Sequence, residues 1–541
     1  MRDKVMPDET TVITRQPQAW NVPGWTSPRP DISGNTPEIW CYTDKFSYFA
    51  GESIQLHVDT TANRYSVEII RDGCEPLTVF READLVGKRN VTPNDAYAAG
   101  CDWPVSTVIQ IDPAWGTGFY LIIASIEVDG VRYSTEHFFV LKAPRESRGR
   151  VALVLTTSTL LAYNDWGGAN GYRGLGDEPY CPDPAFVSAV RRPIARGFLR
   201  IPGDAPRNAH SFTPPPGWVP DHENYEFAHA YGYSRHYADA FWAMYERPFV
   251  VWAERNGYAL DYLTQHDLHF DENALDGYDL VLLVGHDEYW SWEMRDRIDA
   301  FTDNGGNIAR FGGNFIWQVR LSEDGSTQDC YRVPAFDPLR EIQPSRVTTV
   351  WDAPIVGRPA AASLGLTGTA GVYNRYGNAA PRSTGGFTVY RPDHWVFKGT
   401  DLYYGDTFGG APICIAAFEM DGVEYTFRKG LPYPTGDDGA PSNLEILALA
   451  PATAGQTDRW GGTVPLGAPL HEVTDLIDAI YDGNTPDHMK DREYGAGMIG
   501  VFERGEGVVF NAGSTEWVSG LIHKDPYTEQ ITHNVLRRLT Q

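Results

Sequence analysis

The chain has 541 residues, of which 45 are basic and 71 acidic, so its formal net charge is −26. This acidity excludes nucleic acid and anionic membranes as the main partner, because both recruit basic surfaces. A chain of this length suits about two to four domains and can bury a large core, so folding need not depend on disulfides or a structural metal.

The six cysteines are far apart and form no CxxC pair or zinc-type spacing, so no disulfide framework is expected. The longest apolar runs, at residues 151–155 and 280–284, are far too short to cross a bilayer. Residues 1–10 are charged and polar, unlike a signal peptide. The sequence therefore predicts a soluble cytoplasmic protein.

The N-terminal part of the chain has the pattern of β-structure. Residues 1–36 are rich in Pro, Thr and Asp and are expected to form an extended arm. Residues 53–58 alternate with period two, and Asp129-Gly130 lies between two apolar runs, which is a hairpin signal. We therefore expect a β-sandwich over residues 37–145, followed by a polar linker.

From residue 148 onward, strands and helices are predicted to alternate. The apolar run at residues 150–155 is typical of a strand that is buried on both faces. Further strands are expected at residues 279–285 and 307–311, helices at 241–256, 291–304 and 528–539, and a hairpin at 500–503 and 507–511.

Strand, helix and strand in succession predict a mostly parallel sheet. The expected fold class is thus α/β plus all-β. An N-terminal β-sandwich precedes a glutamine-amidotransferase-like, Rossmann-like domain over residues 148–541, with an insertion at about 173–240.

Polar side chains follow two of the predicted strands. His286, Asp287 and Glu288 come directly after the strand at 279–285, and Asn314 follows the next one. Ligands bind at the carboxyl ends of strands in such sheets, where His and carboxylates can hold a metal or transfer protons. An Asn amide can donate to a carbonyl oxygen that gains charge. The alternative is a helix start with a solvated His and a plain Gly-Gly-Asn turn.

Three further motifs have both a functional and a structural interpretation. Tyr163 follows the first parallel strand and is either a metal ligand or an aromatic wall residue. Glu419 and Asp421 lie between apolar residues. They either supply a general base or belong to a surface strand. Residues 221–236 form a pocket lid, a metal site or an aromatic loop packed on the sheet, and their spacing fits no standard zinc motif. The His and Tyr residues of that segment are His222, Tyr225, His229, Tyr231, Tyr233 and His236.

Several catalytic motifs are missing from the sequence. It contains no GxSxG, HExxH, GxGxxG or Walker A motif. No cysteine follows the strand at 280–284, where a glutamine amidotransferase would place its nucleophile. Serine and thiol chemistry are therefore not expected.

Residues 285–314, 156–168 and 507–517 resemble segments of the N,N-dimethylformamidase large (beta) subunit family, and the resemblance covers roughly residues 110–541. It implies a mononuclear iron (Fe³⁺) held by two tyrosinates and one glutamate. Glu288 matches the glutamate and Tyr163 one tyrosine. Tyr120, on the β-strand upstream, is similar to the other tyrosine. The chain is expected to lack an additional N-terminal lectin-like domain.

The same resemblance implies that Glu419 is the general base and that His286 and Asn314 support the site or contact the substrate. The implied function is an iron-dependent amidohydrolase that cleaves a small amide, such as a formamide, by metal-activated water. A homo-oligomer is expected, and the need for a small accessory subunit stays open. The insertion at 173–240 also leaves the substrate open.

Two other functions are compatible with the residues. One is a non-catalytic carbohydrate-binding or structural protein on the same scaffold, in which the 16 Trp and 29 Tyr serve as sugar platforms or core. The other is a zinc hydrolase that uses His286, Glu288 and one of the histidines between residues 222 and 236.

Overall fold

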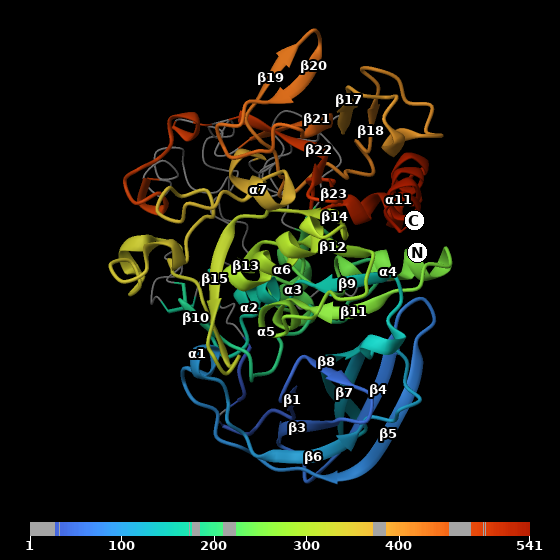
Figure 1. Ribbon diagram of the computed structural model, residues 1–541. Coiled ribbons are helices and arrows are strands. Elements are labelled where there is room, and N and C mark those ends of the chain that lie inside the picture. The colour runs from blue at the N-terminus through green and yellow to red at the C-terminus, as the bar shows by residue number, and fades with distance from the viewer. Residues whose placement is uncertain are drawn as a thin grey trace, which may run out of the picture.

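The computed structural model describes residues 28–31, 33–172, 174–175, 184–208, 223–371, 386–453, 478–490, 492 and 494–540. Most of the predicted N-terminal arm, and parts of the predicted insertion, lie outside these ranges. Within them, no helix has the length and apolar character needed to cross a membrane. Figure 1 shows the N-terminal strands, in blue to teal, at one end of the molecule and the green strands of the central sheet above them.

The N-terminal strands form two sheets around a shared apolar core. The strand orders are β1-β3-β6 and β2-β8-β7-β4-β5. Alternate side chains enter this core, as Tyr120 and Ile122 of β7 do. The elements are β1 (Ile39–Thr43), β2 (Ser47–Phe49), β3 (Ser53–Thr60), β4 (Arg64–Asp72), β5 (Leu77–Val86), α1 (Ala96–Ala99), β6 (Val105–Gln110), β7 (Gly118–Val128), β8 (Val131–Lys142) and η2 (Arg145–Ser147).

A nine-stranded sheet forms the centre of the molecule, in the order β11-β9-β12-β14-β23-β22-β21-β17-β18. Its first five strands run parallel, and the remainder continue antiparallel. β9 and β12 are buried at every residue, as expected for apolar runs covered on both faces. The strands are β9 (Val151–Leu155), β11 (Asp261–Thr264), β12 (Leu280–His286), β14 (Asn307–Gly313), β17 (Phe387–Val389), β18 (Thr407–Phe408), β21 (Glu445–Thr453), β22 (Tyr494–Arg504) and β23 (Gly507–Asn511).

Side-chain caps mark where two of the longer helices begin. Ser291 accepts a hydrogen bond from the Met294 N–H at the start of α6, and Asp525 accepts one from the Thr528 N–H at the start of α11. The helix predicted at 241–256 begins only at residue 246, because Phe241 has a φ of 74° and turns precede the helix. The helices are α2 (Thr157–Tyr163), α3 (Glu223–Tyr231), α4 (Glu246–Arg255), α5 (Gln265–Phe270), α6 (Trp292–Asp303), α7 (Ala361–Leu364), α8 (Gly368–Gly371), α10 (Trp517–Ile522) and α11 (Pro526–Leu539).

Smaller elements lie beside the central sheet. One further sheet has the order β10-β16-β15-β13, and β19 pairs with β20 in a hairpin that projects at the top of Figure 1. The β part and the α/β part are thus both present, while the domain boundaries and the glutamine-amidotransferase-like arrangement remain predictions. These elements are β10 (Val187–Ala189), β13 (Tyr289–Ser291), β15 (Trp317–Leu321), β16 (Thr327–Asp329), η3 (Pro334–Phe336), η4 (Pro344–Arg346), η5 (Trp395–Phe397), β19 (Tyr425–Arg428), β20 (Leu431–Pro434) and η6 (Asp487–Met489).

The N-terminal sheets pack against the loop that precedes α4. The Phe119 ring stacks on Trp242 with ring centroids 3.8 Å apart. Asp72 Oδ2 accepts hydrogen bonds from Trp242 Nε1 at 2.7 Å and from Arg247 Nε at 2.8 Å. Phe119 therefore belongs to the core of the α/β part, whereas its neighbour Tyr120 points into the core between the two sheets.

Candidate active site

The neighbouring strands β12 and β14 end side by side, with His286 paired to Gly313. The two strands end among closely packed segments. Gly285 has a φ of 80°, and a Cβ there would lie 2.3 Å from the Cβ of Tyr245. A Cβ on Gly313 would lie 2.6 Å from the Glu419 carbonyl oxygen. The two glycines therefore allow the loop carrying Glu419 and the residues before α4 to reach the strand ends.

The carboxylate of Glu288 is buried among hydrogen-bond donors. Tyr163 donates to Oε2 at 3.1 Å, and the Tyr172 hydroxyl lies 3.1 Å from both carboxylate oxygens. Trp317 Nε1 donates to Oε1 at 2.8 Å. The backbone N–H of Glu288 donates to Thr159 Oγ1 of α2 at 3.1 Å. Segments from three parts of the chain thus fix the position of one carboxylate.

The phenol hydroxyls around Glu288 also contact one another. Tyr172 Oη lies 2.7 Å from Tyr163 Oη and 2.7 Å from Tyr289 Oη. Burial raises the pKa of Tyr163 and Tyr172 well above the ordinary value, and the Glu288 carboxylate raises both further. In the protein alone these phenols therefore stay protonated, and a cation bound among their oxygens would lower the same pKa values.

Arg332 covers the tyrosines on one side. Its guanidinium lies 4.2 Å from the centre of the Tyr172 ring, and Nη2 donates to Tyr289 Oη at 2.7 Å. Burial raises the pKa of Tyr289, Arg332 acts against this increase, and the net shift is well upward. The arginine supplies the nearest positive charge to these phenols among the contacts described.

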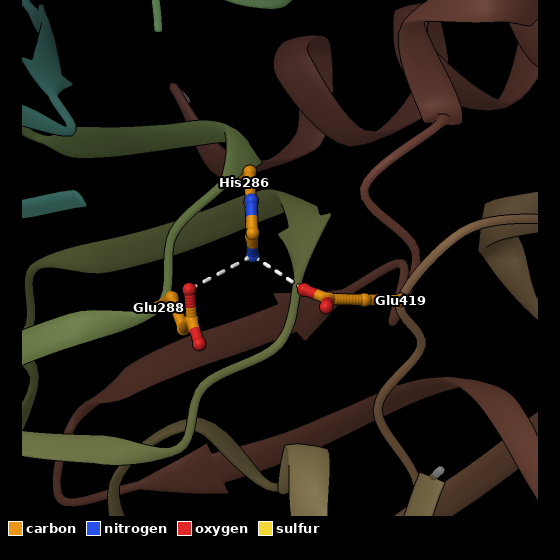
Figure 2. Close-up of side chains that lie close together, drawn as sticks. All are labelled: His286, Glu288 and Glu419. Atoms are coloured by element: carbon orange, nitrogen blue, oxygen red, sulfur yellow. Dashed lines mark ion pairs between the residues drawn. The ribbon is translucent and has the colours of Figure 1, made fainter. Parts of the chain in front are cut away.

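His286 connects Glu288 to Glu419 (Figure 2). Its Nε2 lies 3.3 Å from Glu288 Oε2 and 2.5 Å from Glu419 Oε2. Its Nδ1 lies 2.5 Å from the carbonyl oxygen of Asp239, which sets the ring orientation. Asn314 Nδ2 lies 3.1 Å from the same Nε2 and donates to Glu419 Oε2.

The charges of this group act on one another strongly. Burial lowers the pKa of His286, but the carboxylates of Glu419 and Glu288 outweigh burial and hold that pKa well above its ordinary value. Burial raises the pKa of Glu419 to about 7, although His286 acts in the opposite direction. A buried carboxylate whose pKa lies near neutrality is suited to exchange protons with a substrate.

A buried ion network lies directly behind these residues. Arg310 Nε donates to Asp287 Oδ2 at 3.1 Å, and the same guanidinium pairs with Asp421. Asp421 Oδ1 accepts a hydrogen bond from the Asn314 backbone N–H at 2.6 Å. Asn314 has a φ of 66°, a left-handed conformation that this bond helps to hold. Asp421 therefore positions Asn314 and is not itself among the groups that face Glu288.

Two sets of side chains could hold a metal ion. Ligand atoms of His286, Glu288 and Glu419 lie within 4.8 Å of one another. The other set joins Glu288 to the hydroxyls of Tyr163 and Tyr172. Glu288 is common to both, so it is the central residue of the candidate site.

The structure brings together most of the residues predicted from the sequence, namely Tyr163, His286, Glu288, Asn314 and Glu419. It does not bring Tyr120 to them. The Tyr120 hydroxyl donates to the Gly116 carbonyl oxygen at 2.6 Å, and its ring stacks on Trp115 and Phe139 in the core between the N-terminal sheets. The assignment of Tyr120 as a ligand therefore needs correction.

Sequence reasoning missed several members of the site. Tyr172, Tyr289, Trp317 and Arg332 contact Glu288 or its tyrosines. Tyr289 directly follows Glu288 and was the one most open to prediction, whereas Tyr172 lies in an irregular segment without a period. Of the His/Tyr segment 221–236, His222 and the side chains of Tyr225 and His229 lie outside the described residues.

Comparison with known proteins agrees with the resemblance. No curated protein matches the chain. The family described as "N,N-dimethylformamidase beta subunit-like, C-terminal" matches residues 72–529, a range that includes every residue of the candidate site. The match covers well over half of the sequence, and the chain therefore belongs to the N,N-dimethylformamidase beta subunit-like family.

Proposed function

We propose that this protein is an iron-dependent hydrolase of small amides such as formamides. Family membership supports the proposal. The observation that carries it is the position of Glu288, which is buried among phenol oxygens on one side and beside His286 and Glu419 on the other. Metal-binding oxygens next to proton-transferring groups suit the hydrolysis of an unreactive amide bond.

The donor set around Glu288 is suited to iron. The hydroxyls of Tyr163 and Tyr172 lie 2.7 Å apart, each 3.1 Å from a Glu288 oxygen, and hard anionic oxygens favour hard cations. We assign Glu288, Tyr163 and Tyr172 as the residues that would hold the ion, with Tyr172 in the place first given to Tyr120. Iron bound there would supply Lewis acidity, which polarises the amide carbonyl and makes water more acidic.

Glu419 is the proposed general base, because its buried carboxylate lies 2.5 Å from His286 Nε2 and close to Glu288, and because burial raises its pKa. It takes a proton from water as the water oxygen adds to the carbonyl carbon. The C–N bond then breaks, and Glu419 returns the proton to the nitrogen of the leaving amine. The products are a carboxylic acid and an amine.

Asn314 and His286 complete the proposed mechanism. Asn314 Nδ2, which donates to Glu419 in the protein alone, turns its second N–H toward the carbonyl oxygen as that oxygen gains charge. His286, held through Nδ1 by the Asp239 carbonyl, keeps Glu419 in place and offsets its charge. Both residues thereby favour the transition state.

A second candidate centre is a zinc ion on His286, Glu288 and Glu419, because their ligand atoms converge within 4.8 Å. Zinc there would occupy Glu419 and leave the tyrosines out of the first coordination sphere. Loss of metal on Tyr163→Phe is expected only for the iron centre, and loss on His286→Gln only for the zinc centre.

The test is elemental analysis of the purified protein together with its visible absorption spectrum and a screen of small amides. We expect stoichiometric iron, a phenolate-to-iron absorption band and amide hydrolysis. Tyr163→Phe and Tyr172→Phe should each lose the band, whereas the matched control Tyr120→Phe should keep it. A colourless, metal-free protein that folds normally and hydrolyses no amide would refute the proposal.

Two further features belong to the same proposal. The family is described by a beta subunit, so we propose that this cytoplasmic chain assembles into a homo-oligomer, alone or with a small accessory subunit. The carbohydrate-binding alternative is not favoured. Several tryptophans that it would need as sugar platforms are fully buried, namely Trp166, Trp242, Trp290, Trp351 and Trp517.

A further inference from the structure

An exposed aromatic surface lies at the end of the molecule opposite the N-terminal sheets, around the β19-β20 hairpin (Figure 1). Tyr403 and Tyr404, in the loop before β18, and Phe427 of β19 are 71%, 55% and 49% exposed. The Tyr390 ring links them, because its centroid lies 5.6 Å from that of Tyr404 and 5.5 Å from that of Phe427. We call these four residues the aromatic patch. Exposed aromatic rings that cluster in this way are typical of binding surfaces.

The hairpin that carries Phe427 has little cover of its own. β19 pairs only with β20 among the strands that the structure describes, and Pro432 is the one buried residue of the two strands. Tyr404 Oη donates to the Gly430 carbonyl oxygen in the turn at 2.8 Å, and Arg391 Nη2 donates to the Pro432 carbonyl oxygen at 3.2 Å. A two-stranded hairpin is at best marginally stable in water. A partner that covered the aromatic patch would therefore stabilise it.

Charges of both signs border the aromatic patch. Arg428 and Lys429 follow Phe427 at the tip of the hairpin, whereas Asp401 and Asp406 flank the two exposed tyrosines. All four charged residues are exposed, and none forms an ion pair with another residue that the structure describes. These charges are thus available to a partner that approaches the aromatic patch.

The mixture of charges selects the partner. An acidic surface would be attracted by Arg428 and Lys429 but repelled by Asp401 and Asp406, and a basic surface would meet the reverse. A second copy of this chain satisfies both, because a two-fold axis brings the same surface to both sides of the contact. The net charge of −26 makes two copies repel one another at longer range, so their contact needs a surface that is locally complementary.

We propose that two copies of this chain associate through the aromatic patch about a two-fold axis. Arg428 and Lys429 of each copy then face Asp401 and Asp406 of the other, and the aromatic rings of both copies pack between these charges. The inference rests on the homo-oligomer of the proposed function and names the surface that joins its subunits. It depends neither on the metal nor on the amide substrate.

Sedimentation velocity of the purified protein over a range of concentrations measures the association. We expect the wild type to self-associate and Phe427→Ser to weaken the contact. A two-fold interface contains the substitution twice, so a tenfold loss at each position raises the Kd of the dimer about a hundredfold. The matched control is Val131→Ser in β8, where the valine is 52% exposed, and it should associate as the wild type does.

A charge exchange tests the choice of partner. Lys429→Asp and Asp401→Lys should each weaken the association about tenfold, because each places like charges opposite one another. The double variant should recover the wild-type Kd, because it restores the pair with its charges exchanged. The two positions have φ values of 52° and 55°, a conformation that Asp and Lys both already adopt here. Lys88→Asp, at an exposed position after β5, changes the net charge equally and should have no effect.

A wild type that stays monomeric at every concentration would overturn the inference, as would self-association that Phe427→Ser and Lys429→Asp leave unchanged. Failure of the double variant to recover would overturn it too, because a second copy would then not supply the opposite charge. Circular dichroism checks the fold of each variant, and if Lys429→Asp does not fold, Phe427→Ser decides. None of these results bears on the proposed chemistry, which fails only if the wild type hydrolyses no amide.

Discussion

Replacing Asp421 by Asn should destabilise the protein and displace a residue of the candidate site. Asp421 is fully buried, pairs with Arg310 and accepts hydrogen bonds from the backbone N–H groups of Asn314 at 2.6 Å and Phe315 at 3.2 Å. The amide oxygen of Asn can retain the backbone contacts. Its NH₂ group, however, would face the Arg310 guanidinium, which also carries only donors.

The expected loss follows from these contacts. Removing one partner of a buried ion pair costs about 3–5 kcal/mol. Asp287 still pairs with Arg310, so we expect the lower end, about 3 kcal/mol. Because Asn314 needs Asp421 to hold its φ of 66°, kcat/KM for the preferred amide should fall with the stability.

Guanidinium chloride unfolding, followed by tryptophan fluorescence, measures the first effect, and initial rates measure the second. The matched control is Asp129→Asn in the exposed hairpin between β7 and β8, where the φ of 51° suits Asn as well as Asp. If Asp421→Asn unfolds at the same midpoint as this control and keeps its kcat/KM, the ion network does not position Asn314.

Other changes test the buried titratable groups and the close packing at the site. Burial lowers the pKa of His266 to about 4, so the unfolded chain binds more protons than the folded chain between pH 6.5 and 4. The free energy of unfolding should therefore fall by about 3 kcal/mol as the pH drops through this window. His266→Gln should flatten that dependence when denaturation is measured at several pH values. Burial raises the pKa of Glu246 to about 7, so the effect of pH on stability has the opposite sign, and stability is lost as the pH rises from 4.5 to 7. Glu246→Gln keeps the hydrogen bonds from Thr156 and should therefore unfold no earlier than the wild type at pH 8. A clearly lower unfolding midpoint would contradict this reasoning. Gly285→Ala places a Cβ 2.3 Å from the Cβ of Tyr245 at a φ of 80°, so it should destabilise the protein by about 2 kcal/mol or more and reduce activity, and an unchanged melting temperature would show that the contact relaxes freely.

The residues that sequence reasoning placed well follow from sheet geometry. Apolar runs identified β12 and β14, and the carboxyl ends of adjacent parallel strands must meet, so His286, Glu288 and Asn314 could be expected together. Glu419 lies about a hundred residues further on, and backbone contacts of residues 419–421 with residues 513–515 bring it to the site, which no local period indicates. The pattern left Glu419 open between a general base and a surface strand, and the resemblance assigned it the first role.

Tyr120 shows why resemblance to a family strand was insufficient to place a side chain. Successive residues of a strand point to opposite faces. On β7, Phe119 and Leu121 face the α/β part, whereas Tyr120 and Ile122 face the core between the N-terminal sheets. The strand does contact the α/β part, but its alternation turns Tyr120 away. Tyr172 occupies an irregular segment, where neither a helical nor a strand period could place it.

The packing of the N-terminal sheets on Trp242 connects these sheets to the segment that orients a residue of the candidate site. Trp242 follows Asp239, whose backbone carbonyl orients His286, by only three residues, and it is held by Asp72 and Phe119. A chain shortened to begin at β9 would expose this indole and release the segment that aligns His286. Exchange of the N-terminal sheets for another module would preserve turnover only if the replacement supplied a flat aromatic ring and a hydrogen-bond acceptor at the same place.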